Sequence, residues 1–455
     1  MKDIIKKVIT NLGYDEPDEN QETRVNNWLN WLKGPTSQHN YKVYNGKRYV
    51  KRTYKSLNIP TQSCSDLSDF FFNEKLEITI DKPNIQEVIN ECLEQNNFLE
   101  NSNKLMQLTK ALGTGAYVVY LDNQVLRINY LNATNIVILK ANSIGVQDIL
   151  FWSEEGNELT INIHILGENG YRILNKKFNK VNDNYVEELL DEGVAEIETG
   201  SFIPRFMILK TPEINNFDIN SPYGISCYAN SLDTILALDR AYDSLDNEIA
   251  LGRKRVYVPS SAVQFNIDGS GNPIPAFDEN DVAFYVYPGK ENEKLVESSF
   301  DLRIEEITNA IQGQLNLYTA KVGLGHNYYK FKNGEAYVNT SNVISANSDV
   351  YRKIKKQENI ITRAITGLCY AIADLLGLTE QFSVSVFYDD SIIEDTDSIR
   401  KQAQTEYNTK LISKAQYYRD VYKLGDEEAL AFANQMNEEI LSESIVKDEE
   451  DSYLE

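Results

Sequence analysis

Cysteine is scarce in this sequence, and the spacing of the few cysteines excludes the sites that they usually build. The four residues Cys64, Cys92, Cys227 and Cys369 contain no CxxC pair. They therefore form neither a zinc signature nor a disulfide framework, and they fit synthesis in a reducing cytoplasm.

Long apolar runs are also missing. No stretch approaches the ~18 residues of a transmembrane helix, and the N-terminal residues lack the apolar core of a signal peptide. We expect a soluble protein with no membrane partner.

Positive charge is in deficit. The chain has 455 residues, with 68 acidic against 45 basic side chains, and a formal net charge of −23. A nucleic-acid binder normally shows the opposite balance, because its affinity comes from neutralising phosphates. The sequence therefore argues against tight DNA binding over the whole surface. It does not argue against DNA passing close by, since like charges would keep the DNA from adhering.

No catalytic constellation stands out. Gly113-Thr-Gly115 lacks the Lys-Ser/Thr of a P-loop, so we interpret it as a tight turn, and Gly323-Leu-Gly325 as a helix stop. Residues 389–397 carry the densest group of carboxylates, which nucleases use to bind two metals. No Lys or His accompanies this group, and a solvated acidic face is the simpler interpretation. We expect no catalytic residue, no metal and no cofactor.

The three histidines carry no catalytic prediction either. His39, His164 and His326 are far apart in sequence. His164 lies within a strictly alternating segment, Leu159 to Ile165, which predicts a half-buried strand. Because His164 alternates with Ile163 and Ile165, we expect it to face solvent.

The first 210 residues read as a mixed α+β unit. The expected elements are, in order, helical segments within 1–33, a basic stretch at 41–55, a strand at 76–80, a helix at 83–100, a hairpin at 116–128 and a strand at 159–165. The hairpin turns at Asp122-Asn123.

Helical periodicity dominates the remainder. Apolar residues at intervals of three and four predict helices over 227–254 and 304–322, and a third from about 341 to 377. The first two bracket a β-rich insert at 255–300. A strand at 382–390 and helices over about 398–441 follow, and we expect the acidic tail to be mobile.

Several local stretches, taken with this order of elements, resemble the portal proteins of long-tailed phages that infect low-GC Gram-positive bacteria. The strongest stretch is LKTPEINNFDINSPYGISCYANSLDTILALDRAYDSLDNEIALGRKRVYVP, residues 209–259. The others are NNWLNWLKG with the segment after it, KALGTGAYVVYLDNQVLRINYLNATNIVIL, VFYDDSIIEDTD and LISKAQYYRDVYKLGDEEA. The sequence at 338–343, VNTSNV, departs from the family pattern, which weakens the residue-level correspondence in the loop before it.

The resemblance implies a portal fold of class α+β, with a mixed α/β wing, a two-helix stem, a small β-rich clip, a tunnel loop, a long wing helix and a C-terminal helical crown. Its expected parts are the wing at 1–225, the first stem helix at 226–254, the clip at 255–300, the second stem helix at 301–322, the tunnel loop at 323–340, the wing helix and strand at 341–395, the crown at 396–439 and the acidic tail at 440–455.

The resemblance also implies a function and partners. Such a protein forms a homo-oligomeric ring, a dodecamer in the virion, at one capsid vertex, and double-stranded DNA passes through it during packaging and ejection. The partners implied are the terminase large subunit, head-completion or tail adaptor proteins, and the major capsid and scaffolding proteins. The location implied is the portal vertex of the virion, after assembly in the host cytoplasm. The chain itself would not be an enzyme.

Two groups of residues are candidates for contact with DNA. In the expected tunnel loop, Lys330 and Lys332 alternate with Phe331, so both cations would point one way in an extended segment; Asn327 and Tyr328 precede them. The alternative is a plain exposed loop. The second group, Arg253, Lys254 and Arg255, closes the first expected stem helix. Cations stabilise a helix C-terminus, so stabilisation of this helix is one alternative role, and contact with acidic residues of a neighbouring subunit is another.

The basic stretch at 41–55 is a different kind of surface. We interpret it as one that meets another subunit or the capsid, because duplex DNA offers no bases on which its tyrosines could stack.

Two functions compete with the portal. One is a metal-dependent nuclease built on residues 389–397, and the other is a different ring-forming adaptor of the virion.

Overall fold

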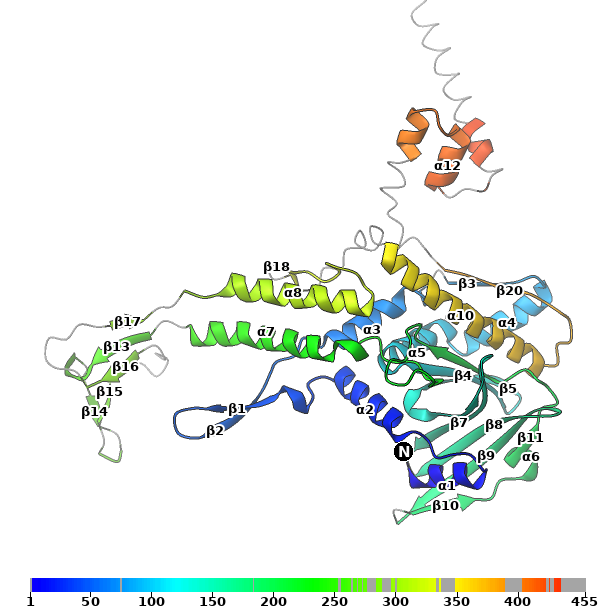
Figure 1. Cartoon of the computed structure of the whole chain (residues 1–455), viewed down its shortest axis with the longest axis horizontal. Helices are drawn as coiled ribbons and strands as arrows, with labels where there is room; N and C mark the ends of the chain where they lie inside the picture. The colour runs from blue at the N-terminus through cyan, green and yellow to red at the C-terminus, as the bar shows by residue number, and fades with distance from the viewer. Residues whose placement is uncertain are drawn as a thin grey trace, which may run out of the picture.

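The structure is a computed structural model, which describes residues 2–73, 76–182, 184–252, 255–262, 265–267, 269–271, 273–275, 284–288, 296–298, 301–332, 335–336, 348–388, 403–422, 425 and 429–434. In these ranges the chain combines helices with mainly antiparallel sheets, which confirms the expected α+β class. A pair of helices projects from a layered body, and a small β-rich insert lies at the far end of the pair (Figure 1). No helix in these ranges is long and apolar enough to span a membrane.

Two stacked sheets form one part of the body. The larger sheet is antiparallel, with the order β10-β9-β8-β7-β6 and with β11 also paired to β9. The smaller sheet has the order β12-β4-β5. The strands are β4 (Thr114–Asp122), β5 (Val125–Asn132), β6 (Ile136–Ala141), β7 (Val146–Glu155), β8 (Glu158–Gly167), β9 (Gly170–Val181), β10 (Asn184–Glu188), β11 (Glu196–Glu198) and β12 (Phe206–Lys210), with the short helix α6 (Glu192–Ala195) before β11.

Alternating side chains place the larger sheet between two apolar layers. On one face, Ile161 and Ile163 of β8 pack against Ile5 and Ile9 of helix α1 (Asp3–Asn11). On the opposite face, Phe151 of β7 packs against the smaller sheet. This arrangement leaves part of the second face uncovered, between the two sheets.

The first six residues of β4 are buried on both faces of the smaller sheet, which explains the apolar run of this strand. Ala116 and Val118 face the larger sheet, whereas Tyr117 and Val119 face a helical core. That core is built by α2 (Glu19–Lys33), α3 (Ile59–Asp69), α4 (Pro83–Gln95), α5 (Phe98–Leu112) and the long helix α10 (Ser348–Leu375). Strands β3 (Glu77–Ile80) and β20 (Val384–Phe387) pair beside it.

The helix pair begins in this core. Helix α7 (Leu232–Leu251) runs outward, and α8 (Ile304–Val322) returns beside it (Figure 1), so both helices expected on either side of the insert are present. In the insert, β13 (Arg255–Pro259) pairs in parallel with β16 (Phe284–Tyr287) and antiparallel with β17 (Val296–Ser298). A separate ladder joins β14 (Phe265–Ile267) to β15 (Pro273–Pro275).

Three further elements complete the fold. A hairpin of β1 (Asn40–Tyr44) and β2 (Tyr49–Thr53) runs alongside α7 (Figure 1). The chain after α8 forms the short ladder of β18 (Phe331–Lys332) and β19 (Glu335–Ala336). Helix α12 (Lys414–Tyr422) lies in the C-terminal region, where helices were expected.

Two expectations for local structure are wrong. The single helix expected at 83–100 is two helices, α4 and α5, separated at Asn96 and Asn97, with Asn97 in a left-handed conformation at φ 47°. The Asn96 side chain explains the break, because it bonds across to β5 by donating to the Leu126 carbonyl at 3.1 Å and accepting from the Ile128 amide at 2.9 Å.

His164 is the second correction, since it is buried rather than solvent-facing. It does lie on the face opposite Ile163, but the smaller sheet covers this part of the face. The imidazole packs against the rings of Phe151 and Phe206, with centroids 5.7 and 5.3 Å away.

Gly113 confirms the expected structural turn. Its φ of 87° is left-handed, and a Cβ there would lie 2.4 Å from the Gly224 carbonyl oxygen. Two segments more than a hundred residues apart therefore cross at this point. The turn between α5 and β4 is a packing contact, and the expected helix stop after α8 is likewise present, with Gly323 at φ 97°.

Candidate functional site

The helix pair is buried at its inner end and exposed at its outer end. Leu238 of α7 and Ile311 and Leu315 of α8 are fully buried in the helical core. Near the insert, Ile249 and Leu251 are 53% and 62% exposed. Exposed apolar area costs roughly 25 cal/mol per Å² relative to burial. The outer half of the pair is thus suited to contact with another protein.

A salt bridge closes the outer end of the pair. The Arg303 guanidinium donates to both carboxylate oxygens of Glu248, at 3.1 and 2.8 Å. Gly252 ends α7 against Leu302, and a Cβ at Gly252 would lie 2.1 Å from a Leu302 methyl carbon. These contacts fix the two chain ends from which the insert extends.

The chain that follows α8 folds back along this helix. The Gln312 side chain binds the backbone of this chain segment through two hydrogen bonds. Its Nε2 donates to the Tyr329 carbonyl at 2.9 Å, and its Oε1 accepts from the Phe331 amide at 2.7 Å. Asn316 Oδ1 accepts from the Asn327 amide at 3.2 Å. We call residues 323–332 the return segment. Its beginning is held on α8 rather than free in solution.

Two buried tyrosines anchor the return segment. The rings of Tyr328 and Tyr329 lie 4.9 Å apart, and both side chains are almost completely buried. The Tyr329 hydroxyl donates to Asp66 Oδ2 of α3 at 2.7 Å. Burial raises the pKa of Asp66, and the bond from Tyr329 opposes that rise. Sequence periodicity gave no signal for this anchor, because the segment is neither helix nor regular strand.

The burial of Tyr328 corrects one candidate DNA contact. Its ring is enclosed by the core in this conformation and cannot meet a ligand outside it. Asn327 and Lys330 are exposed on the return segment, with Phe331 partly buried between Lys330 and Lys332. The backbone of Lys332 belongs to β18, and its side chain lies outside the described part of the structure.

The second group of candidate cations lies elsewhere. Arg255 opens β13 in the insert, and its guanidinium is 5.8 Å from the centre of the Tyr285 ring. Arg253 and Lys254 fall outside the described residues. The strand β18 at the end of the return segment lies beside α8, whereas β13 lies in the insert beyond the outer end of the helix pair (Figure 1), so the return segment and β13 occupy different parts of the fold.

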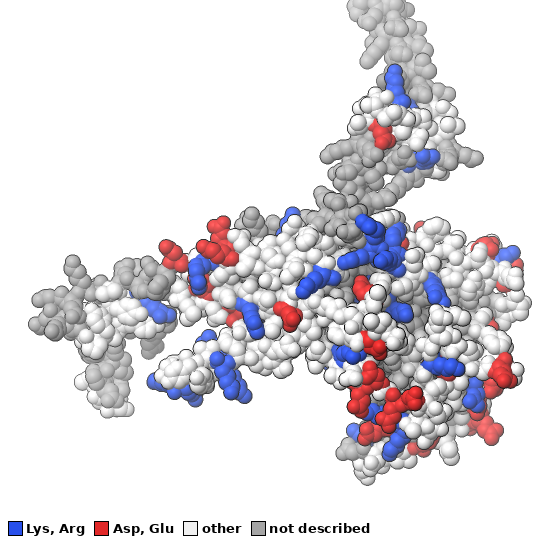
Figure 2. All heavy atoms as spheres, in the orientation of Figure 1, with Lys and Arg blue, Asp and Glu red and all other residues white. Residues whose placement is uncertain are grey.

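The basic stretch at 41–55 forms the β1–β2 hairpin, which sequence reasoning did not predict despite its Asn45-Gly46 turn. Asn45 Oδ1 accepts from the Lys47 and Arg48 amides at 3.1 and 2.9 Å. Lys42 lies directly opposite Lys51 on one face of the hairpin. Figure 2 shows cationic side chains over this hairpin, whereas acidic side chains gather over the lower part of the body.

Like charges directly opposite each other destabilise an isolated hairpin. On the same face of this hairpin, Tyr44 and Tyr49 form the neighbouring cross-strand pair and are 57% and 72% exposed. A two-stranded hairpin is marginally stable by itself. The face therefore has the chemistry of a surface that meets an anionic partner.

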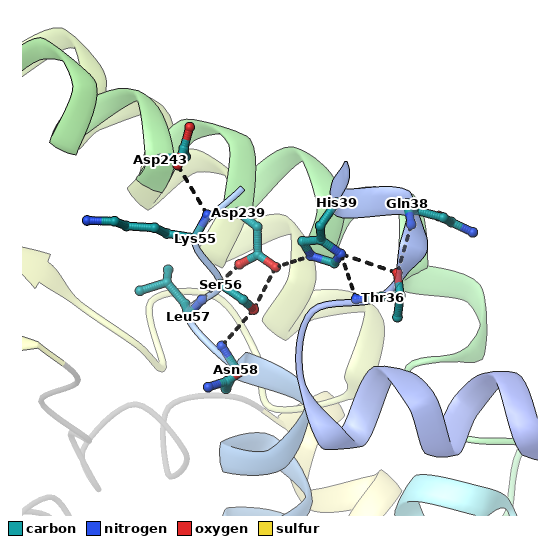
Figure 3. A network of polar contacts seen from close by, with 9 residues as sticks. All are labelled: Thr36, Gln38, His39, Lys55, Ser56, Leu57, Asn58, Asp239 and Asp243. Carbon is teal, nitrogen blue, oxygen red and sulfur yellow. Dashed lines mark hydrogen bonds and ion pairs between the residues drawn. The ribbon is translucent and has the colours of Figure 1, made fainter. Parts of the chain in front are cut away.

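A buried polar network fixes the root of the hairpin on α7 (Figure 3). His39 Nε2 lies 2.9 Å from Asp239 Oδ2, and both residues are fully buried. The Thr36 amide donates to His39 Nδ1 at 3.0 Å, so Nδ1 is the acceptor and Nε2–H donates to Asp239. Asp239 also accepts from the Ser56 hydroxyl at 2.8 Å and the Leu57 amide at 2.9 Å.

One helical turn further along, Asp243 holds the other strand end. Its Oδ1 accepts from the Lys55 amide at 3.2 Å, and its Oδ2 accepts from the Asn247 side chain at 2.8 Å. Both chain ends of the hairpin are therefore bonded to α7, while its tip extends away from the body (Figure 1).

No cluster of three metal-ligating side chains occurs among the residues with described positions. Cys64 and Cys227 approach to 3.9 Å between sulfur atoms, and both are free thiols. The carboxylates of residues 389–397 lie outside the described ranges.

Comparison with known proteins gives the family. A search of the curated proteins finds no match. Among solved structures, the chain is similar to one titled "Neck of native GTA particle computed with C12 symmetry", with 11% sequence identity, coverage of 79% of this chain and 88% of that chain, and a TM-score of 0.39. The family model described as "Phage portal protein, SPP1 Gp6-like" matches residues 14–444. The chain therefore belongs to the family of SPP1 Gp6-like phage portal proteins.

Proposed function

We propose that this portal protein assembles into a twelve-membered ring at one vertex of the capsid and conducts double-stranded DNA during packaging and ejection. The observation that carries the proposal is the projecting helix pair, which is buried only at its inner end. In an isolated chain the outer half, with Ile249 and Leu251, leaves apolar area in water. Head-to-tail contacts between identical copies bury such area, and they close into a ring when the rotation permits.

The β1–β2 hairpin supports the same assembly as a contact between subunits. It carries six cations over residues 40–55 and no acid, so the rest of the chain is even more negative than the net −23. An acidic surface of the next copy would offset the repulsion between Lys42 and Lys51 and would cover Tyr44 and Tyr49. The root network on α7 would hold the hairpin in position for that contact.

The return segment supplies the candidate contacts with DNA. Lys330 and Asn327 are exposed on it, and Lys332 follows Phe331 in β18. If the segment lines the channel, twelve copies present rings of lysines to the phosphates. The strongly negative remainder of the ring would repel DNA, so contact would be limited to these cations. Tyr328 has no place in this proposal, whereas Arg255 and the neighbouring cations could act near the insert.

We assign the proposed partners to two parts of the fold, the insert and the body. The insert at the end of the helix pair would form the clip, where the terminase large subunit docks during packaging and a tail adaptor docks later. The body would form the wing, which meets the capsid and scaffolding proteins. The chain would perform no chemistry of its own and would need no cofactor. It would be assembled in the host cytoplasm and would remain in the virion.

Electron microscopy of the purified protein tests the proposal. Closed rings with a central hole, and a mass by native mass spectrometry that is an integral multiple of 52.0 kDa, are the expected result. A protein that remains monomeric at high concentration and cleaves DNA with Mg²⁺ would support the nuclease alternative instead.

A further inference from the structure

A cleft of about 710 Å³ lies between the two stacked sheets, where the smaller sheet leaves the larger one uncovered. Side chains of β7, β8 and β9 form its floor. Strands β4 and β5 and the segment from α6 to β11 form its walls. We call this feature the intersheet cleft. It belongs to the body and is separate from the helix pair, the return segment and the hairpin.

Three polar side chains on the floor form a chain of hydrogen bonds in which the direction of donation can be assigned. Asn175 Nδ2 donates to the Val194 carbonyl at 2.7 Å, and Asn162 Nδ2 donates to Asn175 Oδ1 at 2.6 Å. Asn162 Oδ1 is then the acceptor for His164 Nε2, which lies 2.6 Å away. The proton of the neutral imidazole therefore resides on Nε2, and Nδ1 is left as an acceptor.

Two polar atoms at the inner end of the cleft have no partner. His164 is 1% exposed, and its Nδ1 makes no hydrogen bond; the buried Nε of Arg205 makes none either. Burial and the nearby Arg205 charge lower the pKa of His164 to about 3, so the imidazole is neutral. Asp374 acts on Arg205 electrostatically, but its Oδ1 accepts from the Ser201 hydroxyl at 2.7 Å. Buried donors and acceptors normally have partners, so this pair indicates a missing ligand.

The shape of the cleft indicates what kind of ligand is missing. From Glu158 to His164 the floor follows seven residues of β8, whose six spacings span about 20 Å at ~3.3 Å per residue. This length matches about six residues of extended chain. The walls include Leu121 and Val194, which are 46% and 51% exposed and thus accessible to an apolar partner. Glu155 lines the opposite end from Arg205.

We propose that the intersheet cleft binds an extended polypeptide segment of a partner protein. The C-terminal carboxylate of this segment lies at Arg205, and its apolar side chains lie against the walls of the cleft. The carboxylate pairs with the Arg205 guanidinium, whose side chain is only partly buried and lines the cleft. A cationic residue at the other end of the segment meets Glu155. The inference does not depend on ring formation, since every residue involved belongs to one chain.

A synthetic pool of random hexapeptides tests the proposal, used once with free C-termini and once with C-terminal amides. The full-length protein is immobilised, and the retained peptides are identified by mass spectrometry. We expect wild type to retain apolar-rich peptides from the free-acid pool at least tenfold over the amide pool. R205Q removes the charge and is expected to lower this retention at least tenfold.

Two further variants keep the test decisive. T160W fills the middle of the floor at an exposed position and is expected to abolish retention, even if R205Q does not fold. R363Q, at an exposed arginine of α10 outside the cleft, is the matched control and should retain peptides as wild type does. Absence of enrichment by wild type, equal retention by T160W, or indifference to both amidation and R205Q would overturn the proposal.

Discussion

The imidazole of His39 and the carboxylate of Asp239 form a fully buried pair, with 2.9 Å between Nε2 and Oδ2 and 200 residues of chain between them. Asp239 accepts two further bonds, from Ser56 and Leu57. The pair is therefore the centre of the contact that attaches the β1–β2 hairpin to α7.

The first prediction is that D239N lowers the free energy of unfolding by about 2–3 kcal/mol, because an amide accepts through one oxygen only and leaves a buried donor unpaired. Trypsin should also cut the basic hairpin faster. The control is D246N, which breaks an exposed pair with Lys55 at 2.7 Å and should cost less than about 1 kcal/mol. Equal effects of the two substitutions in urea unfolding would contradict this role of Asp239.

The crossing of Gly113 and Gly224 predicts strong intolerance of a side chain. G113A places its Cβ 2.4 Å from backbone at a left-handed φ of 87°, so we expect a loss of at least about 3 kcal/mol or failure to fold. Gly13 has a similar φ of 82°, and a Cβ there would have no atom within 4 Å, so G13A isolates the backbone strain at about 1 kcal/mol. Thermal unfolding of both variants separates the contributions of strain and contact.

Lys110 predicts a dependence of stability on pH. Its ammonium is buried beside Gln357, with Nζ 2.8 Å from Oε1, and burial lowers its pKa below the ordinary value of 10.5. As pH rises toward 10.5, the folded chain loses this proton before the unfolded chain does. The unfolding free energy of wild type should therefore rise relative to that of K110M between pH 7 and pH 10. A difference between the two proteins that stays constant over this range in urea unfolding would show that Lys110 is not destabilised by burial.

Removal of the two lysines of the return segment is expected to impair genome packaging without impairing ring assembly. Phages carrying K330A/K332A should form normal portal rings and show a several-fold fall in particles with a full genome. K104A, at an exposed lysine of α5 that pairs with Glu100, is the control for loss of a surface cation. Unchanged packaging and genome retention in the double variant would remove these lysines from the proposed DNA path.

The exposed face of the hairpin predicts an assembly defect. Replacing Tyr44 and Tyr49 by Ser should reduce the fraction of rings measured by mass photometry, while the unfolding free energy of the free chain changes by no more than about 0.5 kcal/mol. I144S, at a 76% exposed residue between β6 and β7, is the control. Rings that form equally well in the double variant would place the hairpin outside the subunit interface.

Elements with strong periodicity could be predicted from the sequence. Helices α7, α8 and α10 lie where apolar spacing placed them, and β8 lies where strict alternation placed it. The same local logic failed for His164, because alternation reports which face a side chain occupies and not what covers that face. It failed at Asn96 for a related reason, since the break between α4 and α5 depends on a bond to Ile128 in a distant strand.

The candidate site was harder to predict. Lys330 was recognisable as an exposed cation, but the burial of Tyr328 and the bond from Tyr329 to Asp66 depend on a contact across 263 residues. His39 looked like an isolated histidine, because its partner Asp239 is far away in sequence. In both cases the deciding interaction is a single tertiary bond, and no periodic pattern in the sequence reports it.

The separation of His39 from Asp239 also has a consequence for synthesis. At about 5–20 residues per second, the ribosome takes about 10–40 s to make the 200 residues between them. Throughout this interval the hairpin root has no Asp239 to bond, and the unpaired strand edges of a nascent hairpin are open to other chains. Anchoring of this hairpin is therefore a late event in the maturation of each subunit.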